Sequence, residues 1–400
     1  MRILYLTNGF PYPLTSGYLR HYFLIKELAR FHRITLLSVV GPGYVPQHAE
    51  AMAPYVERVR TFVAARRGGS RLRKVAERLR SAGRGRAEMR AMRTAVEEEI
   101  KTTCFDAVVL SGKPTYDAIA GLALPPIVAD MCDATSMRLR GQMPYVNLVR
   151  RAVLWLDARY VMSAERAILD KTDRVLFASA RDRTAIVGGP TPRASVVPNG
   201  VDVEFWKRSA PTLGTNTMIF TGAMNYPPNV DAAMFLIEQI LPRVRQTVPD
   251  ARALIVGHSP PPSLVKAGTL PGVTVTGFVD DVRPYLEQAT VFVAPVRFAA
   301  GIQNKLLEAL AMELPAIASP LAADGLRMED GSWPPVQTAD TADEYADAVC
   351  RQFAERGSHS RPAPEGRAYV QSQFNWTLNG EKLNGIIEAA VRDNAQAQVA

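Results

Sequence analysis

Short apolar runs alternate with stretches of helical periodicity along almost the whole chain, and this alternation narrows the choice of fold more than any other feature. Each run has four to seven residues rich in leucine or in β-branched side chains. Such runs are typical of parallel strands whose two faces are both covered by helices. The pattern therefore predicts an α/β architecture in which helices cross over between parallel strands.

Two such series follow one another. In the first, strands are predicted at residues 3–6, 34–40, 106–110, 126–130 and 175–178, with helices near 19–30, 73–101 and 146–169. In the second, strands are predicted at 218–221, 252–256, 273–276, 291–294 and 316–319, with helices at 230–247, 282–288 and 304–312 and a last one from about 376. A Gly/Pro cluster at 188–195 separates them, which indicates two doubly wound domains.

The net charge of +8 is concentrated in one segment. From Arg66 to Arg93 there are eleven Arg and Lys residues against two acids, and the remainder of the chain is close to neutral. A solvated helix face is one interpretation, and docking to an anionic membrane surface is the other. The segment lacks interleaved aromatic residues and any nucleic-acid reader motif, so no nucleic-acid partner is expected.

Cysteine and histidine usage indicates neither a disulfide framework nor a metal site. The three cysteines, Cys104, Cys132 and Cys350, are odd in number and widely spaced, and no pair of the five histidines has metal-ligand spacing. No signal-peptide pattern opens the sequence, and no apolar stretch reaches a membrane-spanning length. We expect a cytoplasmic protein without a metal or other cofactor, with peripheral attachment to the inner face of the membrane as an alternative.

The most informative stretch is residues 294–312, which is predicted to be a strand end, a small-residue loop and a helix entered at Asn304. A helix that begins after such a loop offers unpaired N–H groups and a partial positive charge to an anion. Lys305 and Glu308 lie three residues apart, on a different face from the leucines. The lysine suits a diphosphate, and the carboxylate suits ribose hydroxyls. The alternative is a solvated surface pair.

This stretch resembles the donor motif of the retaining GT-B glycosyltransferases of family four, in which two glutamates separated by seven residues bracket a nucleotide sugar. Other family marks follow in the family's order at residues 198–202, 220–222, 254–257, 275–279 and 374–376. Residues 221–231 and 301–305 resemble, more narrowly, the exopolysaccharide and PEP-CTERM-associated sugar transferases. The resemblance covers nearly the whole chain and is strongest from 198 to 325.

The resemblance implies two Rossmann-like domains that face each other across a cleft. The expected ranges are 1–190 for the acceptor-side domain, 198–375 for the donor domain and 376–400 for a final helix that returns to the first domain. It also implies transfer of a sugar, with retention of configuration, from a nucleotide diphosphate sugar to a glycan, a lipid-linked acceptor or a small molecule. The leaving phosphate itself would take the acceptor proton.

The predicted site residues fall into three groups. The catalytic candidates are Lys305, Arg297 and Asp133. The donor-binding candidates are Glu308, Gly301, Ile302, Gln303, Asn304, Gly222, Phe278, Val279 and His258. The acceptor-side or cleft candidates are Gly17, Arg20 and Asn199. Three alternatives stay open: Asp133 as a helix cap, Gly17 as part of a proline-rich turn, and His258 as a surface histidine.

The sequence departs from the family pattern at two places. Glu308 matches the second glutamate of the motif, but Ala300 stands where the first is expected. The basic residue usual behind the Gly222 strand is also absent, and Arg297 and Lys305 are the candidates to replace its charge. Two other functions are therefore kept open: a nucleotide-sugar epimerase with the GT-B fold, and a non-catalytic module that binds a nucleotide sugar or a membrane.

Overall fold

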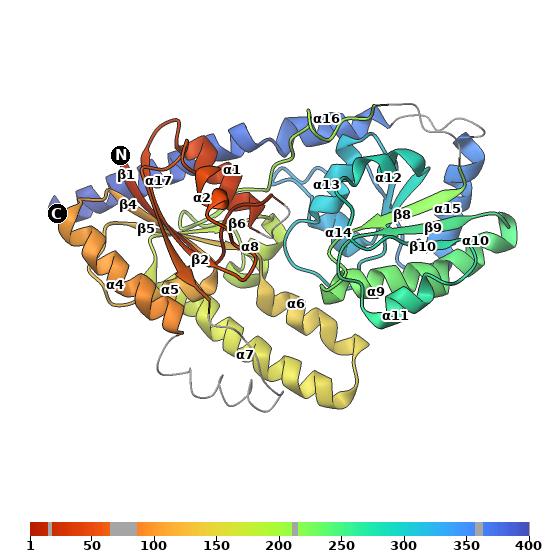
Figure 1. The fold of residues 1–400 in the computed structure, drawn as a ribbon, viewed down its shortest axis with the longest axis horizontal. Coiled ribbons are helices and arrows are strands. Elements are labelled where there is room, and N and C mark those ends of the chain that lie inside the picture. Colours follow the sequence, from red (N-terminus) through yellow and green to blue (C-terminus); the bar gives the residue numbers. More distant parts are fainter. Residues whose placement is uncertain (15–17, 65–85, 210–214, 357–362, 400) are drawn as a thin grey trace.

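The computed structural model describes residues 1–14, 18–64, 86–209, 215–356 and 363–399. They form two α/β domains that lie side by side, each built on a parallel sheet with helices on both faces (Figure 1). This arrangement confirms the fold class predicted from the alternation of apolar and helical segments. Among the described helices, none combines the length and hydropathy that a bilayer span needs.

The first domain contains a seven-stranded sheet in the order β3-β2-β1-β4-β5-β6-β7. All neighbouring strands are parallel. The strands are β1 (Arg2–Thr7), β2 (Arg33–Val40), β3 (Arg58–Val63), β4 (Ala107–Ser111), β5 (Ile127–Cys132), β6 (Arg174–Phe177) and β7 (Ala194–Val196). The strand order changes direction between β1 and β4, which is where doubly wound sheets leave a crevice for a ligand.

The helices of this domain are α1 (Leu19–Leu28), α2 (Gln47–Glu50), α4 (Ala87–Thr102), α5 (Lys113–Ile119), α6 (Thr135–Gln142), η1 (Met143–Tyr145), α7 (Leu148–Lys171) and α8 (Ala180–Val187). Most of the basic segment, residues 65–85, lies outside the described residues. In the described part, the Arg93 guanidinium donates to the Ala120 carbonyl at 2.8 Å and pairs with Glu97 at 3.2 Å.

The second domain contains a six-stranded parallel sheet in the order β10-β9-β8-β11-β12-β13. Its strands are β8 (Thr217–Thr221), β9 (Arg252–Val256), β10 (Val273–Val275), β11 (Val291–Ala294), β12 (Ala316–Ala318) and β13 (Gln337–Thr338). Its helices are α9 (Pro227–Phe235), η2 (Leu236–Ile240), α10 (Leu241–Thr247), α11 (Pro262–Ala267), α12 (Arg283–Gln288), α13 (Asn304–Ala311), α14 (Pro320–Asp324), α15 (Ala342–Arg356) and α16 (Pro364–Gln373). The switch point lies between β8 and β11.

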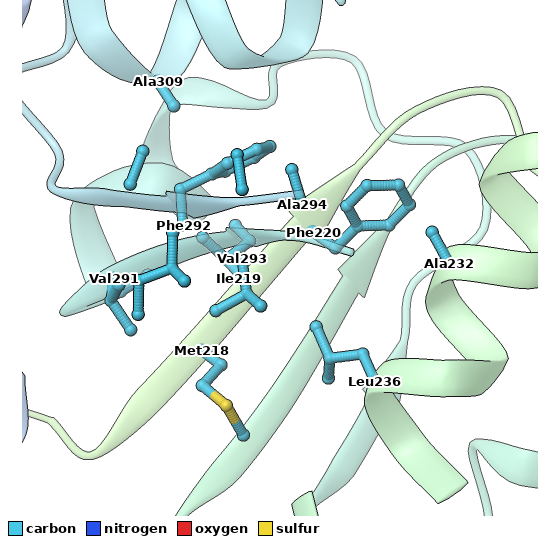
Figure 2. Packing of buried hydrophobic residues seen from close by; sticks show 14 of the residues in the cluster. Met218, Ile219, Phe220, Ala232, Leu236, Val291, Phe292, Val293, Ala294 and Ala309 are labelled. Carbon is cyan, nitrogen blue, oxygen red and sulfur yellow. The ribbon is translucent and has the colours of Figure 1, made fainter. Parts of the chain in front are cut away.

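The core of the second domain fixes the position of α13. Figure 2 shows the apolar side chains of β8 and β11 with Ala309 of α13, and with Ala232 and Leu236 from the segment that follows β8. Phe220 and Phe292 lie in neighbouring strands with ring centroids 6.3 Å apart. Because Leu306, Leu307 and Leu310 are also fully buried, α13 is held on its leucine face and its other face is left for polar groups.

The last helix, α17 (Trp376–Val399), leaves the second domain and packs on the first (Figure 1). Trp376 stacks on Phe23 of α1 at 4.7 Å, and Leu383 and Ile387 belong to the first domain's core. The two helices approach so closely that a Cβ added at Gly380 would lie 2.3 Å from the Glu27 Cβ. The two domains are thus joined by this returning helix as well as by the connection after β7.

Some helices and strands of the structure were not predicted from the sequence. These are strands β3, β7 and β13, and helices α2, α5, α6, η1, α8, α11, α14, α15 and α16. β3 lies at the edge of its sheet and alternates arginines with apolar residues, so it lacks the continuous apolar run of a central strand. β7 and β13 are edge strands of two or three residues, too short to show a pattern.

Candidate active site between the domains

The loops at the carboxyl ends of the two sheets meet across the domain gap. Residues 295–303, between β11 and α13, contact the residues after β5 and β6 of the first domain. Ligands of doubly wound sheets bind beyond the carboxyl ends of the strands. The predicted donor motif is therefore located where a cleft between the two sheets would hold a substrate.

A buried carboxylate joins the two domains. Asp182, in the first turn of α8, is fully buried. It accepts from the backbone N–H of Ala134 at 3.0 Å and from the N–H of Gly301 at 3.0 and 3.2 Å. The Ser179 hydroxyl, which caps α8, also contacts it. A buried charge needs such donors, so the second domain supplies a hydrogen bond that Asp182 requires.

Arg181, next to Asp182 in the sequence, also binds the loop that contains Gly301. Arg181 donates to the Gly301 carbonyl at 3.1 Å and also contacts the Leu321 carbonyl. Gly301 has φ +70°, a conformation that favours glycine, and a Cβ there would lie 3.4 Å from the Asp133 Cβ. The Gly301 N–H predicted to approach the donor is thus bonded to Asp182, and Gly301 lies opposite Asp133.

Asp133 is positioned by a strained turn at the end of β5. Cys132 has φ +59°, and the Asp133 N–H bonds back to the Met131 carbonyl at 2.6 Å. Left-handed backbone at a residue other than glycine costs on the order of 1 kcal/mol and is found most often at functional sites. The half-buried Asp133 carboxylate accepts from the Thr135 hydroxyl at 2.5 Å and lies 3.9 Å from the Lys113 ammonium.

A second polar connection runs from the first domain to the start of α13. The buried Arg20 pairs with Asp130 at 2.8 Å and donates to the Asn199 amide oxygen at 2.9 Å. Asn199 in turn donates to the Asn304 side chain at 2.8 Å. Arg20 and Asn199, both predicted for the acceptor side, therefore connect the first sheet to the entrance of α13. Gly17 lies outside the described residues.

Two glycines make room beside Lys305. A Cβ added at Gly222, where φ is +149°, would lie 2.6 Å from the Asn229 amide and 3.1 Å from the Lys305 Cε. A Cβ added at Gly257 would meet the Gly222 carbonyl oxygen at 1.7 Å. The loop after β8 can lie this close to Lys305 because Gly222 has no side chain, and the loop after β9 can lie against Gly222 because Gly257 has none.

Lys305 and Glu308 are the least compensated charges of the site. The half-buried Lys305 ammonium donates to the Gln303 side chain at 2.9 Å and lies 5.5 Å from the Phe220 ring centroid. Burial lowers the pKa of Lys305 to about 8 and raises the pKa of Glu308 to about 7, while each charge partly offsets the shift of the other. Within the described chain, no ion pair joins them and no hydrogen bond reaches the Glu308 carboxylate. A ligand can supply the missing partners.

Arg297 has different partners. Its guanidinium binds Asp231 through two hydrogen bonds of 2.9 and 2.5 Å and lies over the Tyr145 and Phe235 rings, 4.4 and 5.0 Å from their centroids. The hydrogen bonds to Asp231 are the main reason its pKa is raised. The charge predicted to help the diphosphate is thus neutralised inside the protein, and the contacts do not bring Arg297 to Lys305.

The remaining predicted donor residues have contacts that include neither Lys305 nor Glu308. His258 bonds its neighbour Ser259 at 3.1 Å, and its carbonyl accepts from the Met224 N–H at 2.9 Å, which ties the loops after β9 and β8 together. Phe278 is largely exposed, whereas Val279 packs against the core. Ile302 lines a separate cavity of about 420 Å³ at the domain junction, with Ser179 and Asn379.

Comparison with solved structures identifies the fold class. A structure of Anabaena HepE with UDP and glucose has a TM-score of 0.65 and 14% identity, and the match covers 96% of this chain and 99% of that one. Sucrose-phosphate synthase of Thermosynechococcus elongatus has a TM-score of 0.69 and 13% identity, covering 97% and 99%. The fold is GT-B, as the family resemblance implied.

Sequence comparison points to glycosyltransferases of group 1. The family model described as "Glycosyl transferases group 1" matches residues 215–355. The phosphatidyl-myo-inositol mannosyltransferase of Mycobacterium tuberculosis is 28% identical over 217 residues, and that of Mycobacterium leprae is 26% identical over 213. Each match covers 51% of this chain and 56% of the relative, so the chain spans about half the length of the curated relatives it matches.

Two site residues were missed from the sequence. Ser179 followed three residues later by Asp182 is a helix-start pattern directly after a predicted strand, so α8 could have been recognised. The pattern does not show that the Asp182 carboxylate reaches Gly301, which lies 119 residues further along the chain. Arg181, which binds two carbonyls of the second domain, carries no sequence signal of that contact.

The hydrogen bonds of Asp182 predict that replacing its carboxylate by an amide destabilises the fold. We expect Asp182→Asn to lower the free energy of unfolding by about 2 kcal/mol, because the amide cannot accept as strongly from the donors now bound to the buried carboxylate. Urea denaturation measures this change in the free energy of unfolding, and the m-value should stay the same. Asp343→Asn is the matched control, since that carboxylate is exposed and its ion pair with Arg243 should contribute little. Equal effects of the two substitutions would contradict the structural role of Asp182.

Proposed function

We propose that the protein transfers a sugar from a nucleotide diphosphate sugar to an acceptor, with retention of configuration. The observation that carries the proposal is the pair of partly desolvated charges, Lys305 and Glu308, at the entrance of a helix that opens toward the domain gap. Groups with shifted pKa values in a cleft are typical of functional sites. A diphosphate would compensate Lys305, and hydroxyl groups would compensate Glu308.

The donor diphosphate would bind the first turn of α13. Gln303 precedes this helix without capping it through its side chain, and the first turn contains no acid, so its N–H groups and partial positive charge favour an anion. The glycines at 222 and 257 would let the phosphates approach Lys305. Because Gly301 already donates to Asp182, its N–H serves the domain contact in this proposal, and the first turn of the helix serves the phosphates.

The reaction would depend on stabilising the leaving group. As the bond between sugar and diphosphate loosens, negative charge builds on the phosphate oxygens, and Lys305 and the helix terminus would offset it. The departing phosphate would accept the acceptor's proton. Asp133, across the gap from Gly301, would orient the acceptor or the transferred sugar. Ala300 provides no carboxylate at the position of the first motif glutamate, so the sugar must be held by other groups.

The relatives suggest which compounds to try first. HepE structures contain UDP, UDP-glucose, or UDP with glucose, and the mycobacterial relatives are named for mannosyl transfer to phosphatidyl-myo-inositol. We propose a UDP-linked hexose as the first donor to test and a lipid-linked acceptor as the first acceptor class, ahead of soluble glycans and small molecules.

The proposed role of Lys305 gives a direct test. Donors are first screened by thermal shift, and nucleotide release from the best one is then measured with an acceptor. Lys305→Ala should lower turnover by about 100-fold, because a charge that stabilises the leaving group is removed, while the melting temperature changes little. Lys266→Ala, an exposed lysine of the same domain, is the control. Undiminished turnover of Lys305→Ala would contradict the proposal.

The same assay separates the other functions. A donor that binds but never releases nucleotide, with any acceptor tried, would indicate a non-catalytic binding module. Release without an acceptor, together with an epimerised sugar among the products, would indicate an epimerase. Retention is read from the anomeric configuration of the product.

The charges of the pair also predict the pH dependence of donor binding. Lys305 must be protonated and Glu308 ionised, so affinity for a nucleotide diphosphate sugar should be highest between about pH 7 and 8. Below this window Glu308 gains a proton, and above it Lys305 loses one, so affinity should fall by about tenfold per unit well outside it. Calorimetric titration measures this. Glu308→Gln should remove the acidic limb only, and a flat profile would contradict the assignment.

A further inference from the structure

Helix α7 is apolar on two opposite faces. Leu154, Ala158 and Ile168 attach it to the first domain. On the opposite side, Val149, Val153, Leu156 and Tyr160 follow one another at the i, i+4, i+7, i+11 spacing of a single helix face, and all four are exposed. Figure 1 shows α7 along the lower edge of the first domain.

The exposed apolar face of α7 consists of several neighbouring residues and not of one isolated surface residue. Val149 is 79% exposed and Tyr160 69%, and on the adjoining side of the helix Leu148 is 77% exposed and Trp155 is half exposed. All residues from 147 to 153 are exposed, and the hydrogen bond that the Arg151 guanidinium donates to the Met143 carbonyl, at 3.1 Å, is a contact of this part of α7 with the preceding turn. Contiguous apolar surface of this kind marks an interaction site.

The exposed charges beside this face are arginines, and the half-buried Asp157 is the acid next to it. Arg150, Arg151 and Arg159 are exposed, and none of them forms an ion pair with a carboxylate of the described chain. The Arg159 guanidinium lies 4.9 Å from the centre of the Trp155 ring. Aliphatic side chains with Trp and Tyr, bordered by arginines, are the composition of helices that lie in the interface of a membrane.

We propose that this face of α7, the Val149–Tyr160 stripe with Leu148 and Trp155, docks the protein on an anionic lipid surface. The apolar side chains would enter the boundary between headgroups and acyl chains, and Arg150 and Arg159, on the two flanks of the stripe, would bind lipid phosphates. A second copy of the chain fits this face less well. A two-fold contact uses the same patch of both copies, so the arginines of one copy would lie near the arginines of the other and repel them.

The docking face is connected to the candidate active site. The segment between α6 and α7 carries Tyr145, whose ring stacks on Phe298 at 5.7 Å and lies under Arg297. α6 itself begins two residues after Asp133. If the proposed transfer reaction is correct, docking through α7 would bring a membrane-borne acceptor to the acceptor side of the cleft. The docking itself does not depend on that reaction.

The test is flotation of the full chain with vesicles. The wild type should bind vesicles made from an equimolar mixture of phosphatidylglycerol and phosphatidylcholine. It should bind vesicles of pure phosphatidylcholine at least about tenfold more weakly. The double variant Val149→Asp/Leu156→Asp should lose about tenfold or more of the partition coefficient. The matched control is Val265→Asp/Leu270→Asp, which changes the same residue types at exposed positions of the second domain and should leave binding unchanged. Arg150→Glu/Arg159→Glu should abolish the preference for anionic vesicles.

The other outcomes overturn the proposal. The proposal is wrong if the wild type does not bind vesicles. It is also wrong if the Val149→Asp/Leu156→Asp variant still binds them, which would indicate another surface such as residues 66–93. A dimer that dissociates only in the α7 variant would show that a second copy covers the face. Donor-dependent nucleotide release, measured without vesicles, reports on the proposed reaction separately and should be the same in the α7 variant and in its control.

Discussion

The bond between the Asp182 carboxylate and the Gly301 N–H is the contact on which the arrangement of the candidate site depends. It crosses the domain gap between two buried groups, so opening the gap would leave the Gly301 N–H without its partner and Asp182 with only the donors of its own domain, Ala134 and Ser179. Gly301 can occupy its left-handed conformation there because it has no side chain. Closure of the domains and the shape of the loop before α13 are therefore coupled through one carboxylate.

The polar chain from Arg20 through Asn199 to Asn304 adds a second link to the same helix. Both links end at the entrance of α13 and leave its outward face to Lys305 and Glu308. These two side chains give up part of their hydration without a full protein partner, which is unfavourable until a ligand binds. The rigid contacts thus hold in place a pair of charges that the described residues compensate only in part.

The sequence was sufficient for the central strands and for the place of α13, because continuous apolar runs report burial on both faces of a sheet. The spacing of Lys305 and Glu308 was also sufficient to place both side chains on one side of this helix, away from its leucines. The sequence could not show that Arg297 pairs with Asp231, which belongs to another helix, or that Asp182 bonds to Gly301, because that contact is set by the packing of two domains. The edge strand β3 and the exposed face of α7 also depend on neighbours that the local pattern does not report.

The claim that the entrance of α13 binds a diphosphate can be tested by hydrogen exchange with UDP. The amides of Asn304 and Lys305, which begin the helix, should exchange at least about tenfold more slowly when UDP is bound, because phosphate oxygens accept from them. Amides of α17 near residues 383–390 should not change. Saturating UDP that slows exchange elsewhere and leaves the start of α13 unaffected would contradict the claim.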